Sequence, residues 1–210
     1  MGSPGSASFW DDKYINNEAH WDMRTPTPVF ESLMDSGEFM HPGKILIAGC
    51  GKGYDAVLAA KKGYDVYAVD FSIEAIKLAR ELAAKENVKV NLIHEDIFKL
   101  GSVYKGFFDY VYDYVTYCAI VPERRKKYAE ITGTFLKQDG KLIALLFPVE
   151  DRRGGPPYAV DVKEFYELFS EHLKLKFSSK KINSIHPRQG REVLQVYIKK
   201  DLQKSDADKS

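Results

Sequence analysis

The sequence predicts an α/β protein built on a doubly wound, mostly parallel sheet, and three observations lead to this fold class. Short apolar runs of strand length alternate with segments whose apolar residues recur at helical spacing. A glycine-rich turn directly follows the first apolar run, at residues 49–53. Two segments near the carboxyl end, 175–182 and 193–199, are expected to form strands that follow each other without an intervening helix, which predicts an antiparallel hairpin. We therefore expect seven strands with helices on both faces of the sheet.

Apolar periodicity and helix-capping residues define the individual elements. Strands are expected at 45–48, 66–69, 88–94, 107–115, 141–147, 175–182 and 193–199. One helix is expected at 29–34, and a second runs from the glycine-rich turn to Gly63. Further helices are expected at 72–87, 122–137 and 161–173, and an aromatic helical segment precedes all of them. Ser72 and Asp161 can cap the helices that they precede, because their side chains accept hydrogen bonds from first-turn N–H groups.

The stretch from Lys44 to Asp70 carries the clearest functional signal. The strand 45–48 leads into Gly49 and Gly51, a helix follows, and the next strand ends on Asp70, 21 residues after Gly49. Glycines let the backbone approach a ligand, a helix start offers free N–H groups, and the carboxylate can accept both hydroxyls of a ribose. This unit predicts a nucleotide-type site, the alternative being a glycine-rich connection without a ligand.

The glycine spacing and the aromatic segment before it favour S-adenosyl-L-methionine (SAM) over a nicotinamide dinucleotide. The dinucleotide fingerprint G-x-G-x-x-G requires glycine where this chain has Tyr54. Trp10, Tyr14 and Trp21 lie in the segment 9–40, and aromatic faces attract a cation such as the sulfonium of SAM. We expect this segment to close over the site as a lid, although it could instead only cover the sheet.

Acidic residues follow two further strands at their carboxyl ends, where open α/β sheets bind ligands. Asp96 could accept the adenine amino group while Ile97 or Phe98 packs on the ring, or Asp96 could simply cap a helix. Asp113 and Tyr114 end the strand 107–115, where an acid in a buried strand is unexpected unless it meets ligand or solvent.

Composition limits the classes of function. The 210 residues suit one domain, and a net charge of +1 gives no reason to expect nucleic acid or an anionic membrane as partner. We expect a flexible segment 1–8, a single domain 9–200 and a disordered tail 201–210, in a monomeric cytoplasmic protein. Cys50 and Cys118 are too few for a disulfide framework or a metal cluster, so no metal is expected, and both fit buried structural thiols better than nucleophiles.

Several longer stretches resemble the thiopurine S-methyltransferase family, and most closely its plant halide/thiol methyltransferase branch and bacterial relatives. The resemblance extends from about residue 10 to 192. The matching stretches are WDMRTPTP (21–28), IAGCGKGYD (47–55), AVDFSIEAI (68–76), EDIF (95–98), FDYVYDYVTYCAIVPERR (108–125), FPVEDRRGGPPYAVD (147–161) and RQGRE (188–192). The chain departs from the plant pattern at Arg24, which comes one position early, and at Phe147, where the plant branch has tyrosine.

The resemblance implies a Rossmann-like class I methyltransferase that uses SAM, releases S-adenosyl-L-homocysteine (SAH) and methylates a small soft nucleophile. Such acceptors are a thiol, sulfide, a thiopurine, a halide or a related species. The expected cofactor contacts are Trp10, Tyr14, Trp21, Gly49, Gly51, Asp70, Phe71, Asp96, Ile97 and Tyr114. The acceptor-pocket candidates are Phe147, Tyr158, Arg188 and Asp113, with His186 as a further candidate for orienting a thiol and no strong general base in view.

Three alternatives remain at the level of sequence. A class I methyltransferase could act on oxygen or nitrogen of another small metabolite through the same cofactor site. The chain could bind SAM without catalysis, or it could be a nicotinamide-dependent dehydrogenase.

Overall fold

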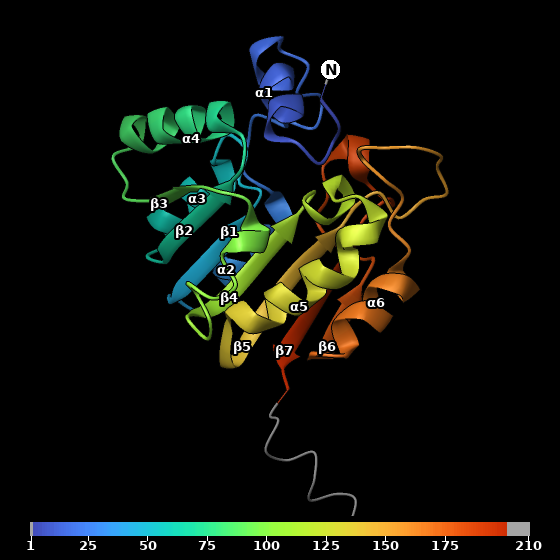
Figure 1. Cartoon of the computed structure of the whole chain (residues 1–210). Coiled ribbons are helices and arrows are strands. Elements are labelled where there is room, and N and C mark those ends of the chain that lie inside the picture. Colours follow the sequence, from blue (N-terminus) through green and yellow to red (C-terminus); the bar gives the residue numbers. More distant parts are fainter. Residues whose placement is uncertain (1, 201–210) are drawn as a thin grey trace, which may run out of the picture.

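The protein folds around one seven-stranded sheet, which confirms the predicted fold class (Figure 1). The computed structural model describes residues 2–200, so residue 1 of the expected flexible segment and the expected tail 201–210 lie outside the described residues. The strands are β1 (Lys44–Ala48), β2 (Asp65–Asp70), β3 (Asn91–His94), β4 (Phe108–Tyr114), β5 (Leu136–Leu146), β6 (Leu173–Ser179) and β7 (Val193–Lys199). Their order is β3-β2-β1-β4-β5-β7-β6, and β7 alone among them runs antiparallel to its neighbours.

Helices cover both faces of the sheet. They are α1 (Ala7–Ile15), α2 (Pro28–Ser36), α3 (Tyr54–Lys61), α4 (Ile73–Lys85), α5 (Arg125–Phe135) and α6 (Val162–Ser170), with 3₁₀ turns η1 (Ile97–Lys99), η2 (Tyr117–Ala119), η3 (Pro122–Arg124) and η4 (His186–Arg188). One apolar core joins the sheet to α2 and α3, and a second joins the opposite face to α5 and α6. In Figure 1, α1 stands apart from these layers, above the edge of the sheet at which the strands β1 and β4 end.

The alternation of side chains along β4 decides which residues reach each core. Tyr112 faces α2, where its ring stacks on Phe30 with the centroids 3.9 Å apart. Tyr114 packs against the same core, whereas Asp113 points to the opposite face and meets Tyr128 of α5. This alternation places Tyr112 and Tyr114 together and separates both from Asp113.

Both predicted helix caps form. The Ser72 hydroxyl accepts a hydrogen bond from the Ala75 N–H at 3.2 Å at the start of α4. The Asp161 carboxylate accepts hydrogen bonds from two N–H groups in the first turn of α6. These caps satisfy backbone donors that would otherwise lack partners.

The largest difference from the predicted elements lies at the start of β5. We expected a helix through residue 137 and a strand from 141, but α5 ends at Phe135 and the strand begins at Leu136. Leu136 pairs with Phe108, and regular pairing resumes only where Lys141 meets Tyr110. Asp139, with a φ of 61°, lies in this irregularity. Polar residues inside the irregular strand resemble a turn, which is why the pattern predicted one.

None of the helices within residues 2–200 is long and apolar enough to cross a membrane.

Candidate active site

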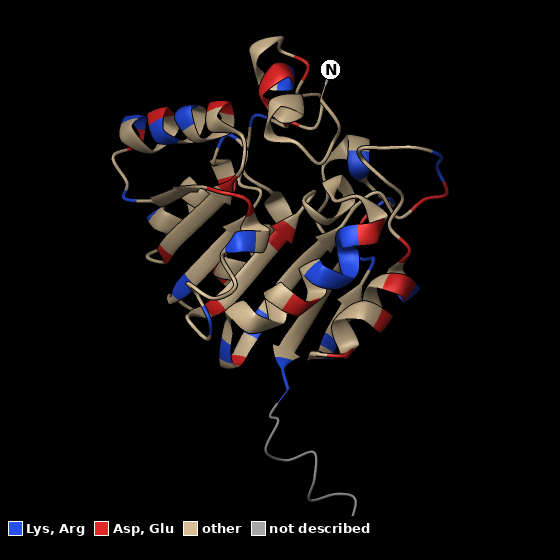
Figure 2. Ribbon diagram, viewed as in Figure 1, with Lys and Arg blue, Asp and Glu red and all other residues tan. Residues whose placement is uncertain are grey.

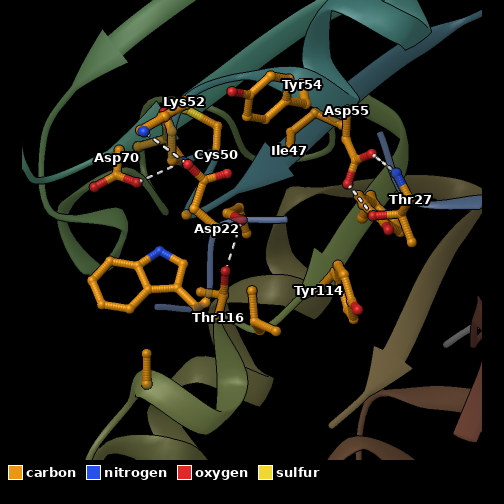
Figure 3. Close-up of a pocket in the computed structure, with 18 of the residues that line it drawn as sticks. Asp22, Thr27, Ile47, Cys50, Lys52, Tyr54, Asp55, Asp70, Tyr114 and Thr116 are labelled. Carbon is orange, nitrogen blue, oxygen red and sulfur yellow. Dashed lines mark hydrogen bonds and ion pairs between the residues drawn. The ribbon is translucent and has the colours of Figure 1, made fainter. Parts of the chain in front are cut away.

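A large cavity opens at the carboxyl ends of β1, β2 and β4, the edge at which ligands bind to open α/β sheets. Its walls also include α1, the segment 21–29 and the segment 184–192. All ten residues that we expected to contact a cofactor line it: Trp10, Tyr14, Trp21, Gly49, Gly51, Asp70, Phe71, Asp96, Ile97 and Tyr114. Figure 3 places Asp70 at one side of this cavity and Asp55 with Thr27 at the other, so we call these sides the Asp70 end and the Asp55 end.

The glycine turn forms the floor at the Asp70 end. Gly49 has a φ of 52°, and a Cβ at this position would lie 2.4 Å from the Thr116 hydroxyl, so a side chain cannot fit. Gly53, with a φ of 81°, lets α3 pack against α4, because a Cβ there would lie 2.9 Å from the Cβ of Ala79. The third glycine therefore serves close helix packing, and the first makes room for the Thr116 side chain.

Asp70 is the acidic group of this floor. One carboxylate oxygen accepts the Gly51 N–H at 2.9 Å, and the other accepts the Ser72 N–H at 2.9 Å. Burial is the main influence on this group and raises the pKa of the Asp70 carboxyl, while these two hydrogen bonds act against the rise. Each oxygen keeps a free lone pair, so the carboxylate can accept two hydroxyls of a ribose.

Three aromatic rings stand over the same end. Trp21 meets Trp10 edge-on with the centroids 5.2 Å apart, and it meets Tyr14 edge-on at 5.7 Å. The carboxylate of Asp11 fastens α1 to the start of α4, where it accepts the Ser72 hydroxyl at 2.6 Å. The segment 9–40 thus brings its aromatic side chains to the floor that carries Asp70, as a lid requires.

Asp96 and Arg124 close one wall of the cavity. One oxygen of Asp96 accepts the Phe98 N–H at 3.0 Å, which is the capping role considered from the sequence. Its other oxygen pairs with the Arg124 guanidinium at 3.1 Å. That guanidinium also stacks on the ring of Phe98, 3.7 Å from the centroid. Asp96 and Ile97 line the cavity in this arrangement, so both can still face an adenine.

Asp55 anchors the polypeptide at the opposite end. Its carboxylate accepts the N–H and the hydroxyl of Thr27, each at 2.7 Å (Figure 3). Both bonds tie the segment 21–29 to the first turn of α3. The Tyr112 hydroxyl lies beside this pair, is buried, and has no hydrogen-bond partner within residues 2–200.

A second polar group at this end joins β4 to the segment 184–192. The Tyr114 hydroxyl donates to the Glu192 carboxylate at 2.5 Å, and the Ser184 hydroxyl donates to its other oxygen. The Arg188 guanidinium lies 4.9 Å from the centroid of the Tyr114 ring and donates to the Trp21 carbonyl at 2.7 Å. Arg188 is only 4% exposed, and its Nη1 has no partner in the described part of the chain.

Of the four acceptor-pocket candidates, Arg188 lines the cavity and the other three do not. Phe147 lies behind Arg188, with the guanidinium 4.6 Å from its ring centroid. Tyr158 follows a bend at which its N–H donates to the Cys118 carbonyl at 2.7 Å, and its side chain lies outside the cavity wall.

Asp113 is turned away from the cavity by the alternation of β4. It accepts the Tyr128 hydroxyl at 2.6 Å and the Tyr117 N–H at 3.2 Å. Burial raises the pKa of its carboxyl to about 6. The acid in the strand is thus satisfied by protein donors, an explanation that the sequence pattern did not offer.

The two cysteines do not present reactive thiolates. Burial raises the pKa of the Cys118 thiol to about 12, and it raises the pKa of the Cys50 thiol well above its usual value. Both thiols are therefore protonated at neutral pH. Cys118 is buried, and Cys50 is half-buried at the cavity floor.

Several lining residues were not anticipated from the sequence: Asp22, Lys52, Thr27, Asp55, Tyr112, Arg124 and Glu192. The period of two along β4 could have found Tyr112, because it shares a face with Tyr114. The position of Asp55 in the first turn after the glycines could have marked it as an acceptor for N–H groups. No sequence signal brings Glu192 to Tyr114, because 78 residues separate them.

Figure 2 shows acidic and basic residues interspersed on most of the helices. Many of them form exposed pairs, such as Lys61 with Glu86 on neighbouring elements. Such pairs contribute little to stability. Within the described residues the buried charges that concern the site are those around Arg188 and Glu192.

Comparison with known proteins finds related methyltransferases. The family model described as thiopurine S-methyltransferase (TPMT) matches residues 6–204. A probable thiol methyltransferase 2 of Arabidopsis thaliana is 33% identical over 198 residues, covering 91% of this chain and 85% of the relative. Thiocyanate methyltransferase 1 of the same plant is 34% identical over 188 residues, covering 88% and 82%. A thiopurine S-methyltransferase of Vibrio campbellii is 26% identical over 193 residues, covering 86% and 89%.

Solved structures share the fold. The 1,6-didemethyltoxoflavin-N1-methyltransferase of Burkholderia thailandensis, solved with 1,6-didemethyltoxoflavin and SAH bound, superposes with a TM-score of 0.73 at 18% identity. The superposition covers 96% of this chain and 92% of that one. A TehB-like SAM-dependent methyltransferase of Corynebacterium glutamicum gives a TM-score of 0.65 at 18% identity, covering 94% and 100%.

Proposed function

The chain belongs to the thiopurine S-methyltransferase family and is a SAM-dependent methyltransferase, and from this premise we propose how its cavity divides the reaction. SAM binds at the Asp70 end, and a small soft nucleophile binds at the Asp55 end. The observation that carries this division is the placement of a buried guanidinium, Arg188, across the cavity from a half-buried carboxylate of ribose-binding type, Asp70.

The Asp70 end has the groups that SAM requires. Asp70 has free lone pairs for the ribose hydroxyls, and Gly49, which lines the cavity without a side chain, lets the backbone approach the ligand. Trp10, Tyr14 and Trp21 supply aromatic surface for a sulfonium cation, an attraction of about 0.5 to 2 kcal/mol when the cation is desolvated. When bound, SAM supplies a methyl group already activated by the positive sulfur. The protein therefore needs no residue to activate the donor.

The Asp55 end suits an acceptor that is polarisable and carries a lone pair. Arg188 and Tyr112 line the cavity, and Nη1 of Arg188 and the Tyr112 hydroxyl are buried donors without a hydrogen-bond partner among the described residues. Phe147 lies behind Arg188 and supports its guanidinium by a cation–π contact. Phe147 therefore positions Arg188 and does not itself contact the acceptor. A thiol, sulfide, thiocyanate or halide presents the electron-rich atom that these donors can orient.

The residues contribute to catalysis by alignment and by exclusion of water. Asp55 fixes the segment 21–29 on one side of the acceptor, and Trp21 receives the hydrogen bond of Arg188 on the other. Holding two reactants in line can supply about 7 to 11 kcal/mol of the barrier. The lid closes the site to solvent, and a soft anion attacks more readily when it is less hydrated.

The same proposal extends to the setting of the reaction. With a net charge of +1 and charges of both signs interspersed, the surface offers no attraction for nucleic acid. We place the protein in the cytoplasm as a monomer with a small-molecule acceptor as its partner. Size-exclusion chromatography with light scattering measures the oligomeric state directly.

The test compares the wild type with Arg188→Met in thiocyanate methylation, followed by SAH release. Loss of one hydrogen bond to a charged group, about 1.5 to 3 kcal/mol, predicts a KM for thiocyanate that rises by about 10- to 150-fold. Calorimetry with SAH on both proteins shows whether the donor end remains intact. An unchanged KM, or equal losses in SAH affinity and acceptor KM, contradicts the assignment of Arg188 to the acceptor.

A further inference from the structure

Glu192 is a buried carboxylate that lines the cavity and takes no part in the reaction as described so far. It is 2% exposed. The Tyr114 hydroxyl donates to one oxygen at 2.5 Å, and the Ser184 hydroxyl donates to the other. Tyr114 and Ser184 also line the cavity. A carboxylate in this position costs free energy unless its surroundings stabilise the charge.

Hydrogen-bond donors and cationic groups surround Glu192. Two hydroxyls donate to its carboxylate. Two guanidinium groups also lie within electrostatic range: that of Arg188, which contacts the Tyr114 ring, and that of Arg191, which directly precedes Glu192 in the chain. Tyr112, from the same strand as Tyr114, also faces it. Asp55 is another acid at this end of the cavity, and each of its oxygens accepts one hydrogen bond from Thr27 on the segment 21–29. Glu192 differs from Asp55 in that a phenol, the Tyr114 hydroxyl, joins it to the cavity by a hydrogen bond.

We propose that Tyr114 and Glu192 form a proton relay that lets the enzyme use a neutral thiol directly. This inference deepens the proposed function and rests on it. In the step, the S–H bond of the acceptor breaks as its sulfur bonds to the methyl carbon, and the carbon–sulfonium bond breaks to leave neutral SAH. The thiol proton passes to the Tyr114 oxygen while the Tyr114 proton passes to Glu192, which becomes neutral. Atoms and charge balance without any further reactant.

The physical need for such a relay depends on the acceptor. A thiol with a pKa of about 8.5 is only a few per cent thiolate at pH 7, and a thiol that enters an apolar cavity does so most readily in its neutral form. Burial raises the pKa of the Tyr114 hydroxyl well above its usual value, so it cannot hold the negative charge alone. The adjacent Glu192 supplies the base that the phenol lacks. Thiocyanate and halides carry no proton, and they do not need the relay.

The readout is the pH dependence of thiol methylation. We compare the wild type, Glu192→Gln and Tyr114→Phe, with 2-mercaptoethanol as the acceptor, from pH 6.5 to 9. Glu167→Gln on α6 is the matched control, because it removes the same charge from a side chain that is 61% exposed and remote from the cavity. Thermal melting of each variant checks that the fold is retained.

The relay predicts different profiles for the four proteins. The wild type and Glu167→Gln hold a nearly constant kcat/KM for the thiol below its pKa. In Glu192→Gln and Tyr114→Phe, kcat/KM for the thiol at pH 7 falls by about 100-fold, which is the lower end of general-base effects. In both variants this kcat/KM then rises about tenfold per pH unit as the thiolate forms. Thiocyanate, which carries no proton, serves as the reference acceptor. The ratio of thiol turnover to thiocyanate turnover falls in both variants at pH 7 and recovers toward pH 9.

A binding measurement separates the relay from a structural role. In the complex with SAH, tryptophan fluorescence reports thiol binding, because Trp21 lines the cavity. The wild type should bind the thiol equally from pH 6.5 to 8.5, whereas Glu192→Gln should bind it more tightly as the thiolate forms beside Arg188. Parallel pH profiles for wild type and Glu192→Gln overturn the relay. A wild type that methylates thiocyanate and no thiol overturns the relay alone, whereas no turnover of either overturns the proposed function as well.

Discussion

Replacing Asp70 by asparagine tests the donor end of the cavity. Each carboxylate oxygen already accepts one backbone N–H, from Gly51 or Ser72, both at 2.9 Å, and so has one lone pair left for a ribose hydroxyl. Asparagine replaces one of these oxygens by an NH₂ group, which removes one charge-assisted bond to the ligand. The loss of about 1.5 to 3 kcal/mol corresponds to SAH binding that is about 10- to 150-fold weaker, measured by titration calorimetry.

Asp65→Asn is the matched control for this measurement. Asp65 begins the same strand at the opposite end, and it is 46% exposed and paired with Lys44 at 2.8 Å. The same change of charge there should leave SAH affinity near the wild-type value. The reasoning is refuted if folded Asp70→Asn binds SAH as tightly as Asp65→Asn does.

Three further predictions concern the lid, the Asp55 end and the acid of β4. Trp21→Ala should weaken SAM binding more than SAH binding, because only SAM carries the sulfonium, by about two- to thirtyfold in the ratio of dissociation constants; an unchanged ratio contradicts the lid. Asp55→Ala removes two bonds to Thr27 and should lower the free energy of unfolding in urea by about 3 kcal/mol, whereas Asp55→Asn, which can keep both bonds, should remain near wild type. The pKa of Asp113 is about 6 in the folded protein against 3.8 for the free group, so its protonated form stabilises the fold at low pH and that contribution is lost as pH rises through 6. Relative to wild type, Asp113→Asn should therefore gain about 2 kcal/mol of unfolding free energy between pH 4 and pH 7, and a constant difference across this window contradicts the assignment.

The donor end could be predicted from the sequence because its parts are local. Gly49 and Gly51 follow a strand directly, and Asp70 ends the next strand in a parallel unit, so one turn and one register bring the three together. Trp10 and Tyr14 lie one helical turn apart, which placed them on a common face. Periodicity and spacing are sufficient where the chain supplies neighbours within about one supersecondary unit.

The acceptor end could be predicted only in part because it is assembled from distant segments. Arg188 was identified, but its support by Phe147 and the pairing of Glu192 with Tyr114 depend on how β7 lies beside β5. Asp113 was misjudged because an acid in a strand gives no sign of its partner, and here the partner is Tyr128 on a helix across the second core. Side-chain direction at the end of a strand is decided by packing, which composition does not reveal.

The most direct test of the central claim is SAH release by the wild-type protein on a panel of acceptors at neutral pH. The panel contains sulfide, 2-mercaptoethanol, a thiopurine, thiocyanate and iodide, with a catechol and a primary amine as oxygen and nitrogen acceptors. The division of the cavity between Asp70 and Arg188 predicts turnover with sulfur acceptors and none with the catechol or the amine. Methyl transfer confined to oxygen or nitrogen contradicts the account, and so does tight SAH binding with no turnover on any member of the panel.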